Sequence, residues 1–194
     1  MSGSSRIRTD LALEATESFA QSNTELRGVE VKEQYDEERD IRTTVVKITT
    51  ENGAKAMGRP QGNYITIEAP NLSASDEDYH REISEEIARH LRKLVNLKRE
   101  TSVLVVGLGN QAITADALGP HVVDNLRMTR HIIREYGLKS TEKEILHRVS
   151  GLAPGVWLRQ EVGKLQKFVM GVVAETKPDL VIAVDALAAA VSEG

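Results

Sequence analysis

Two aspartates in this chain stand in the same tripeptide, Asp-Ala-Leu, at positions 116–118 and 185–187. Each tripeptide follows an apolar segment typical of a buried strand, residues 103–108 in the first case and residues 180–184 in the second. In open α/β sheets, functional side chains gather at the carboxyl ends of the strands. Two carboxylates placed there could share one proton and activate water for attack on an amide, as paired aspartates do in acid-type proteolysis.

The surroundings of the two aspartates predict different acidities. Asp116 lies in a loop just before an expected helix, whose N-terminus should favour the charged carboxylate. Asp185 follows five apolar residues and precedes Ala-Leu-Ala, so burial is expected to disfavour its charged form. Such a pair could divide the roles of base and acid. The alternative is structural: Asp116 caps the following helix, and Asp185 accepts a hydrogen bond from a neighbouring loop.

A glycine-rich segment, Gly107–Ala112, matches the looser dinucleotide-binding pattern G-x-G-x-x-A directly after a strand. That pattern requires a helix to begin inside the motif, whereas the next helix is expected only at Pro120. An acidic residue ending a second strand about 20 residues later is also missing. We therefore expect these glycines to allow a tight turn and close backbone approach.

The five histidines show no H-x-x-x-H or H-E-x-x-H spacing that would indicate a metal site. His80 and His90 are expected on the surface of a helix. One metal-binding alternative stays open, in which Asp116, Asp185 and a loop histidine such as His147 hold an ion. No cofactor is expected.

The composition narrows the function classes. The chain has no cysteine, which excludes disulfides and thiolate chemistry. A net charge of −4 and an aromatic content of 4% argue against a nucleic-acid partner. No apolar stretch reaches the roughly 20 residues that span a bilayer, and the first residues lack the apolar core of a signal peptide. A cytoplasmic protein with no membrane partner is expected.

The spacing of apolar residues along the chain predicts the helices and strands that position the two aspartates. The first half predicts a short helix over 11–20 and then three strands, at 28–32, 43–49 and 63–68, joined as a hairpin or meander. A long helix follows, with Ser75 opening its capping box. The second half predicts strand 103–108 and a helix from Pro120 to about Tyr136, stopped by Gly137. A short strand and turn within 147–155, a helix from 158 and strand 180–184 complete an α/β pattern with parallel neighbours.

Several longer motifs occur in a fixed order along the chain. They are the segments 7–12, 105–110, 114–120, 123–126, 129–131, 153–156 and 178–189. In this order they resemble the germination protease family of spore-forming Firmicutes. The series D-A-L-G-P, V-D-N-L and T-R-H is far more specific than a glycine loop.

The resemblance implies an endopeptidase that degrades small acid-soluble spore proteins in the spore core when germination begins. It implies a zymogen, a homotetramer and an atypical aspartic protease that needs no metal, with Asp116 and Asp185 as its catalytic pair. The fold is expected to be a three-layer α/β/α sandwich with a mainly parallel sheet, similar to the hydrogenase-maturation peptidases, plus the N-terminal β-meander. A pro-segment over 1–10 would be cleaved between Asp10 and Leu11, leaving one domain over 11–194.

The chain also departs from the family pattern. Residues 157–163 replace a stretch rich in Gly and Thr, and Ala190 follows where the family has Arg-Ser. The family also continues well beyond this length, so the domain is expected to be truncated at its C-terminus. Two alternatives therefore stay open: a metal-assisted peptidase of the hydrogenase-maturation type, and a non-catalytic fragment.

Overall fold

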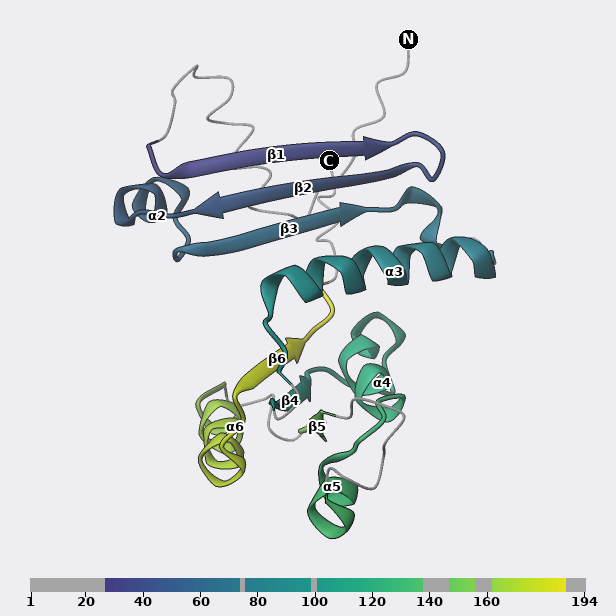
Figure 1. Cartoon of the computed structure of the whole chain (residues 1–194), viewed down its shortest axis with the longest axis vertical. Coiled ribbons are helices and arrows are strands. Elements are labelled where there is room, and N and C mark those ends of the chain that lie inside the picture. Colours follow the sequence, from purple (N-terminus) through teal and green to yellow (C-terminus); the bar gives the residue numbers. More distant parts are fainter. Residues whose placement is uncertain (1–26, 74–75, 99–100, 138–146, 156–161, 188–194) are drawn as a thin grey trace. The chain divides into compact units, whose positions relative to one another are not determined.

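The computed structural model of this chain describes residues 27–73, 76–98, 101–137, 147–155 and 162–187 (Figure 1). It divides into two compact units, the first ending at Asn96 and the second beginning at Leu97. The predicted helix over 11–20, the pro-segment and the junction at Asp10 and Leu11 lie outside the described residues.

The first unit contains strands and helices in the order β1 (Val29–Asp36), β2 (Ile41–Ile48), α2 (Glu51–Met57), β3 (Gly62–Glu68), the 3₁₀ turn η1 (Pro70–Ser73) and α3 (Glu77–Leu94). The second unit contains β4 (Ser102–Gly107), the 3₁₀ turn η2 (Thr114–Asp116), α4 (Leu118–Asp124), α5 (Arg130–Tyr136), β5 (Arg148–Leu152), α6 (Val162–Thr176) and β6 (Leu180–Val184). The molecule is therefore a mixed α/β protein.

The sheet of the first unit is antiparallel, with the strands in the order β1-β2-β3 (Figure 1). Val46 of β2 lies opposite Val31 on one side and Tyr64 on the other. Val46, Ile48 and Met57 form its buried apolar cluster. The predicted meander is confirmed, because β2 pairs antiparallel with β1 on one side and with β3 on the other.

The connection between β2 and β3 contains a helix that the sequence interpretation missed. The expected connection is that of a hairpin or meander. In the structure Thr50 caps α2, accepting a hydrogen bond from Gly53 N at 3.1 Å, and Gly58 ends it in the left-handed conformation at φ 61°. Met57 then packs into the core, so burial of one side chain stabilises a helix that propensity alone does not predict.

The long helix α3 begins one residue later than predicted. Its N-cap is Asp76, whose Oδ1 accepts from Asp78 N at 3.0 Å and Tyr79 N at 3.2 Å. Ser75, the predicted start of the capping box, lies outside the described residues. An aspartate N-cap satisfies the same backbone N–H groups that a serine would, so the shift leaves the helix itself unchanged.

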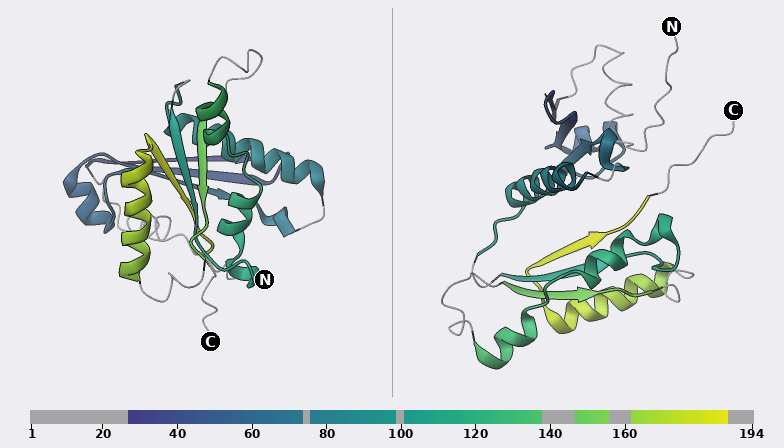
Figure 2. Two further views of the ribbon diagram at one scale, coloured as in Figure 1. Left: turned by 90° about the horizontal axis from the view of Figure 1, so that it is seen from below. Right: turned by 90° about the vertical axis from the view of Figure 1, so that its right-hand side faces the viewer.

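The second unit is built on a parallel sheet with the strands in the order β5-β4-β6 (Figure 2). The central strand β4 has all six residues buried, which explains its continuous apolar run. Val105 lies between Gly151 of β5 and Ile182 of β6. The predicted strands at 103–108 and 180–184, the short strand after His147 and the parallel pairing are confirmed.

The predicted single helix from Pro120 to Tyr136 is wrong: it is two helices, α4 and α5, separated at residues 125–129. α4 buries Val123 against Val103 and Val105 of the sheet. Thr129 then leaves the helical path and attaches to β5, its N–H donating to Val149 O at 3.1 Å while its hydroxyl accepts from Val149 N at 3.1 Å. Bonding to the strand outweighs continuation of the helix, so Thr129 of the T-R-H motif has a structural role here.

Candidate active site

The carboxyl ends of β4 and β6 bring the two predicted aspartates to one edge of the parallel sheet. Gly107 at the end of β4 pairs with Val184 at the end of β6, and Leu108 N donates to Val184 O at 2.8 Å. Asp185 follows Val184 directly, and Asp116 lies in the loop that leaves β4. The expected placement of both carboxylates beyond adjacent strand ends is therefore confirmed.

The loop that carries Asp116 is closed on itself. Asn110 N donates to Asp116 O at 3.0 Å, and Asp116 N donates to Ile113 O at 2.8 Å. Asn110 also accepts a hydrogen bond from Ala112 N through Oδ1 at 3.0 Å. These bonds fix the shape of the short segment on which Asp116 stands.

Two glycines allow this loop to lie against the sheet. A Cβ at Gly109, which has φ +131°, would lie 2.0 Å from Asp116 O and 3.3 Å from Asp116 Oδ1. A Cβ at Gly107 would lie 2.1 Å from Gly119 O. The interpretation of these glycines as residues of close approach is confirmed. The α-helix that follows starts at Leu118, beyond the G-x-G-x-x-A motif. A dinucleotide site requires the helix to start inside that motif.

Asp116 is partly exposed and stands just before α4. The N-cap position of α4 is held by Ala117, which makes no side-chain cap hydrogen bond. Asp116 therefore lies one residue before the N-cap position of α4.

The expected burial of Asp185 is also wrong. Its side chain is exposed, and its Oδ1 accepts a hydrogen bond from the adjacent Ala186 N at 2.9 Å. The reason is the position of β6 at the edge of the described sheet, where burial alternates along the strand and Val181 is 41% exposed. An apolar run does not distinguish an edge strand from a central one, so the sequence could not predict this difference.

Exposed apolar side chains accompany both carboxylates, a feature that sequence reasoning missed. Leu118, two residues after Asp116, is 53% exposed, and Leu187, two residues after Asp185, is 81% exposed. Ile113 in the same loop is 53% exposed. Carboxylates beside apolar side chains suit contact with a polypeptide, whose backbone is polar and whose side chains are often apolar.

His147 does not join the aspartates. It precedes Arg148, which pairs with Ser102 at the amino end of β4, whereas the aspartates lie beyond the carboxyl end. A strand of this length separates the two edges by roughly 15–20 Å at about 3.3 Å per residue. The predicted alternative of an ion held by Asp116, Asp185 and His147 is wrong for this geometry. Across the described ranges, no three His, Asp or Glu side chains form a group that could hold a metal ion.

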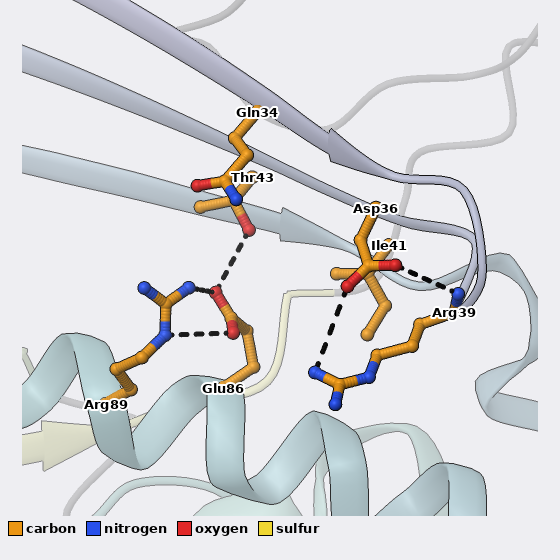
Figure 3. A pocket seen from close by; sticks show the side chains of 7 residues that line it. All are labelled: Gln34, Asp36, Arg39, Ile41, Thr43, Glu86 and Arg89. Carbon is orange, nitrogen blue, oxygen red and sulfur yellow. Dashed lines mark hydrogen bonds and ion pairs between the residues drawn. The ribbon is translucent and has the colours of Figure 1, made fainter.

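A separate pocket of about 260 Å³ lies within the first unit, between α3 and the antiparallel sheet (Figure 3). Its lining is mostly polar: Gln34, Asp36, Arg39, Ile41, Thr43, Glu86 and Arg89. Glu86 is its central group, bound by Arg89 through both carboxylate oxygens and by His90 Nε2 at 2.9 Å. His90, expected on the surface, is buried at 8% exposure because it faces Glu86 rather than solvent. The charge of Glu86 is paired with that of Arg89, and the charge of Asp36 with that of Arg39. We therefore interpret this group of paired side chains as structural.

The carboxylate of Glu86 is expected to stabilise the first unit in a pH-dependent way. Burial raises the pKa of Glu86, but hydrogen bonds from Arg89 and His90 outweigh it and hold the pKa below its ordinary value. A carboxyl group with a lowered pKa stabilises the folded state above its ordinary pKa, and this contribution is lost as the pH falls through the folded-state value. Glu86→Gln should therefore cost about 1–2 kcal/mol at pH 7 and progressively less towards pH 3.

Urea unfolding of wild type and variant between pH 7 and pH 3 measures this difference. Glu85→Gln, on an exposed position of the same helix, is the matched control and should change the free energy of unfolding by less than about 0.5 kcal/mol. A Glu86→Gln cost that stays constant over this pH range would contradict the assignment.

Comparison with known proteins adds an independent finding. A family model described as germination protease matches residues 7–193 of this chain. Proteins named germination protease are 46% identical over 182 residues in Caldanaerobacter subterraneus subsp. tengcongensis, 40% over 183 residues in Clostridium tetani and 38% over 192 residues in Priestia megaterium. Each match covers 94% of this chain.

The same matches cover 54%, 55% and 50% of those three relatives. The chain thus spans about half the length of the curated relatives it matches. Within the described part of the chain, no helix combines the length and apolar character needed to cross a lipid bilayer.

Proposed function

Because this chain belongs to the germination protease family, we propose that its protein is an endopeptidase that degrades small acid-soluble spore proteins during germination. Asp116 and Asp185 are its catalytic pair. The observation that carries the proposal is their delivery to one sheet edge by adjacent parallel strands, joined by the Leu108–Val184 hydrogen bond. The substrate is a protein of the spore core.

The proposed reaction uses one aspartate as a carboxylate and the other as a carboxylic acid. The carboxylate takes a proton from water while the water oxygen bonds to the peptide carbonyl carbon, and the acid protonates the carbonyl oxygen. The tetrahedral intermediate then breaks its C–N bond, and the leaving nitrogen takes a proton from the carboxyl that received one from water. As the C=O bond re-forms, one hydroxyl of the intermediate returns its proton to the aspartate that protonated the carbonyl oxygen. Both aspartates thus return to their starting forms, so the cycle balances without any further reactant.

Family membership also underlies the remaining parts of the proposal. The chain forms part of a three-layer α/β/α sandwich, is made as a zymogen with a pro-segment over residues 1–10, and assembles as a homotetramer. Cleavage between Asp10 and Leu11 removes the pro-segment. Residues 11–194 then belong to one domain that contains both compact units.

The test is an assay of the purified protein on a small acid-soluble spore protein, with and without a chelator. We expect the substrate to be cut at internal peptide bonds at a rate that chelation leaves unchanged. Loss of cleavage on chelation, with recovery when a metal ion is added back, would favour the metal-assisted peptidase instead. Absence of cleavage by a folded protein would contradict the proposal.

A further inference from the structure

The loop from Leu108 to Ala117 is attached to the second unit at both ends. Its internal bonds, such as Asn110 N to Asp116 O at 3.0 Å, fix its shape but not its position relative to the sheet. Its base is tied to β6 through Leu108 N and Val184 O. Its other end continues into Ala117, which is 5% exposed, and into α4.

A side-chain hydrogen bond also attaches the middle of the loop, one residue from Asn110, whose N–H donates to Asp116 O. Gln111 Nε2 donates to Asp124 Oδ2 at 2.7 Å, joining the loop to the last residue of α4. α4 is itself fixed, because Val123 is 5% exposed and packs on the sheet. The bond therefore connects the loop to a packed element.

Asp124 is the last residue of α4, where its negative charge needs a hydrogen-bond donor to stabilise it. A negative charge at the C-terminal end of a helix is unfavourable, because the helix dipole is negative there. An amide donor at 2.7 Å offsets this cost, and a hydrogen bond to a charged acceptor is stronger than one between neutral groups. Gln111 and Asp124 are both exposed, so they can be substituted without disturbing the core.

We propose that Gln111 and Asp124 are positioning residues that hold Asp116 in its place for catalysis. This inference rests on the proposed function for its effect on rate. It assigns no contact with substrate to either residue: both act through the loop. Since a displacement of about 1 Å can lower a rate about 100-fold, loss of one exposed attachment is expected to lower kcat about tenfold.

The test exchanges the donor and the acceptor of the hydrogen bond between Gln111 and Asp124. Gln111→Glu sets two carboxylates against each other and should lower kcat about tenfold, with KM within about twofold. Asp124→Asn keeps an acceptor oxygen for Gln111 but removes its charge, so it should lower kcat by about twofold to threefold, clearly less than Gln111→Glu. The double variant Q111E/D124N reverses the bond, since the Asn amide now donates to Glu, and should recover kcat to within about threefold.

A second readout does not need activity. Hydrogen exchange at the amides of Ala112 and Asp116 should be about tenfold faster in Gln111→Glu and should return to the wild-type rate in the double variant. If the wild type cleaves no spore protein, the proposed function fails while this exchange pattern still supports the attachment. The inference would be overturned if Gln111→Glu showed the hydrogen exchange and kcat of the wild type. It would also be overturned if the double variant failed to recover the exchange rate or the kcat lost in Gln111→Glu.

Discussion

Asp185→Asn is expected to lower the cleavage rate of a small acid-soluble spore protein by about 10²–10⁴-fold, and Asp116→Asn by a similar factor. Each substitution removes one carboxyl group that the proposed reaction needs while keeping the size and shape of the side chain. In Asp185→Asn the side-chain amide oxygen can still accept from Ala186 N, so the backbone at the end of β6 has no reason to move. The thermal unfolding midpoint should therefore change little, and steady-state cleavage measured on folded protein reports the chemistry alone.

The matched control lies at the opposite end of the same strand. Asp179 precedes β6, and its Oδ2 accepts from Ser102 N at 2.8 Å. Asp179→Asn keeps an acceptor oxygen, so it should leave kcat within about twofold of wild type. Near-normal cleavage in Asp185→Asn or Asp116→Asn would remove that residue from the catalytic pair.

Gly119→Ala is expected to destabilise the second unit by about 3 kcal/mol and to abolish cleavage at the same time. A Cβ at this position would lie 2.3 Å from Leu108 O, 2.5 Å from Leu108 N and 2.5 Å from Val184 O. All three are backbone atoms, and two of them form the hydrogen bond that joins β4 to β6. The methyl group can be accommodated only by separating the strand ends that carry the two aspartates.

Gly171→Ala provides the matched control. Gly171 lies within α6, and a Cβ there would meet nothing within 4 Å. Alanine favours a helix over glycine, so this variant should be more stable by about 0.5–1 kcal/mol and should keep full activity. Denaturant unfolding measures both variants. A Gly119→Ala protein with wild-type stability and activity would show that the loop and strand ends are less constrained than the contacts indicate.

The sequence predicts well the strands and the glycine turn that carry the candidate site, because each has a clear local pattern. The apolar runs 103–108 and 180–184 both predict strands, and parallel pairing places Asp116 and Asp185 beyond the carboxyl ends of neighbouring strands. Gly107 and Gly109 follow the first strand where the backbone must pack closely. These features depend on local composition and on the general geometry of α/β sheets.

The details that could not be predicted depend on contacts between distant residues. The break before Thr129 arises from its bonds to β5, which no local pattern reveals. His90 is buried because Glu86 lies one helical turn away beneath the sheet, and the charge-rich helix surface conceals that pairing. The exposure of Asp185 follows from the edge position of β6, which depends on strand order rather than on residue type.

The strand order β5-β4-β6 also affects when the site can form. β4 lies between its two partners, and β6 joins it only after α4, α5, β5 and α6 have followed along the chain. Contacts between residues far apart in sequence form slowly, because closing the long intervening loop costs entropy. The aspartate after β6 is therefore the later of the two to be synthesised, and its approach to β4 closes a long loop. A newly synthesised chain can therefore bring the two carboxylates together only after all the intervening elements, from α4 to β6, have been made.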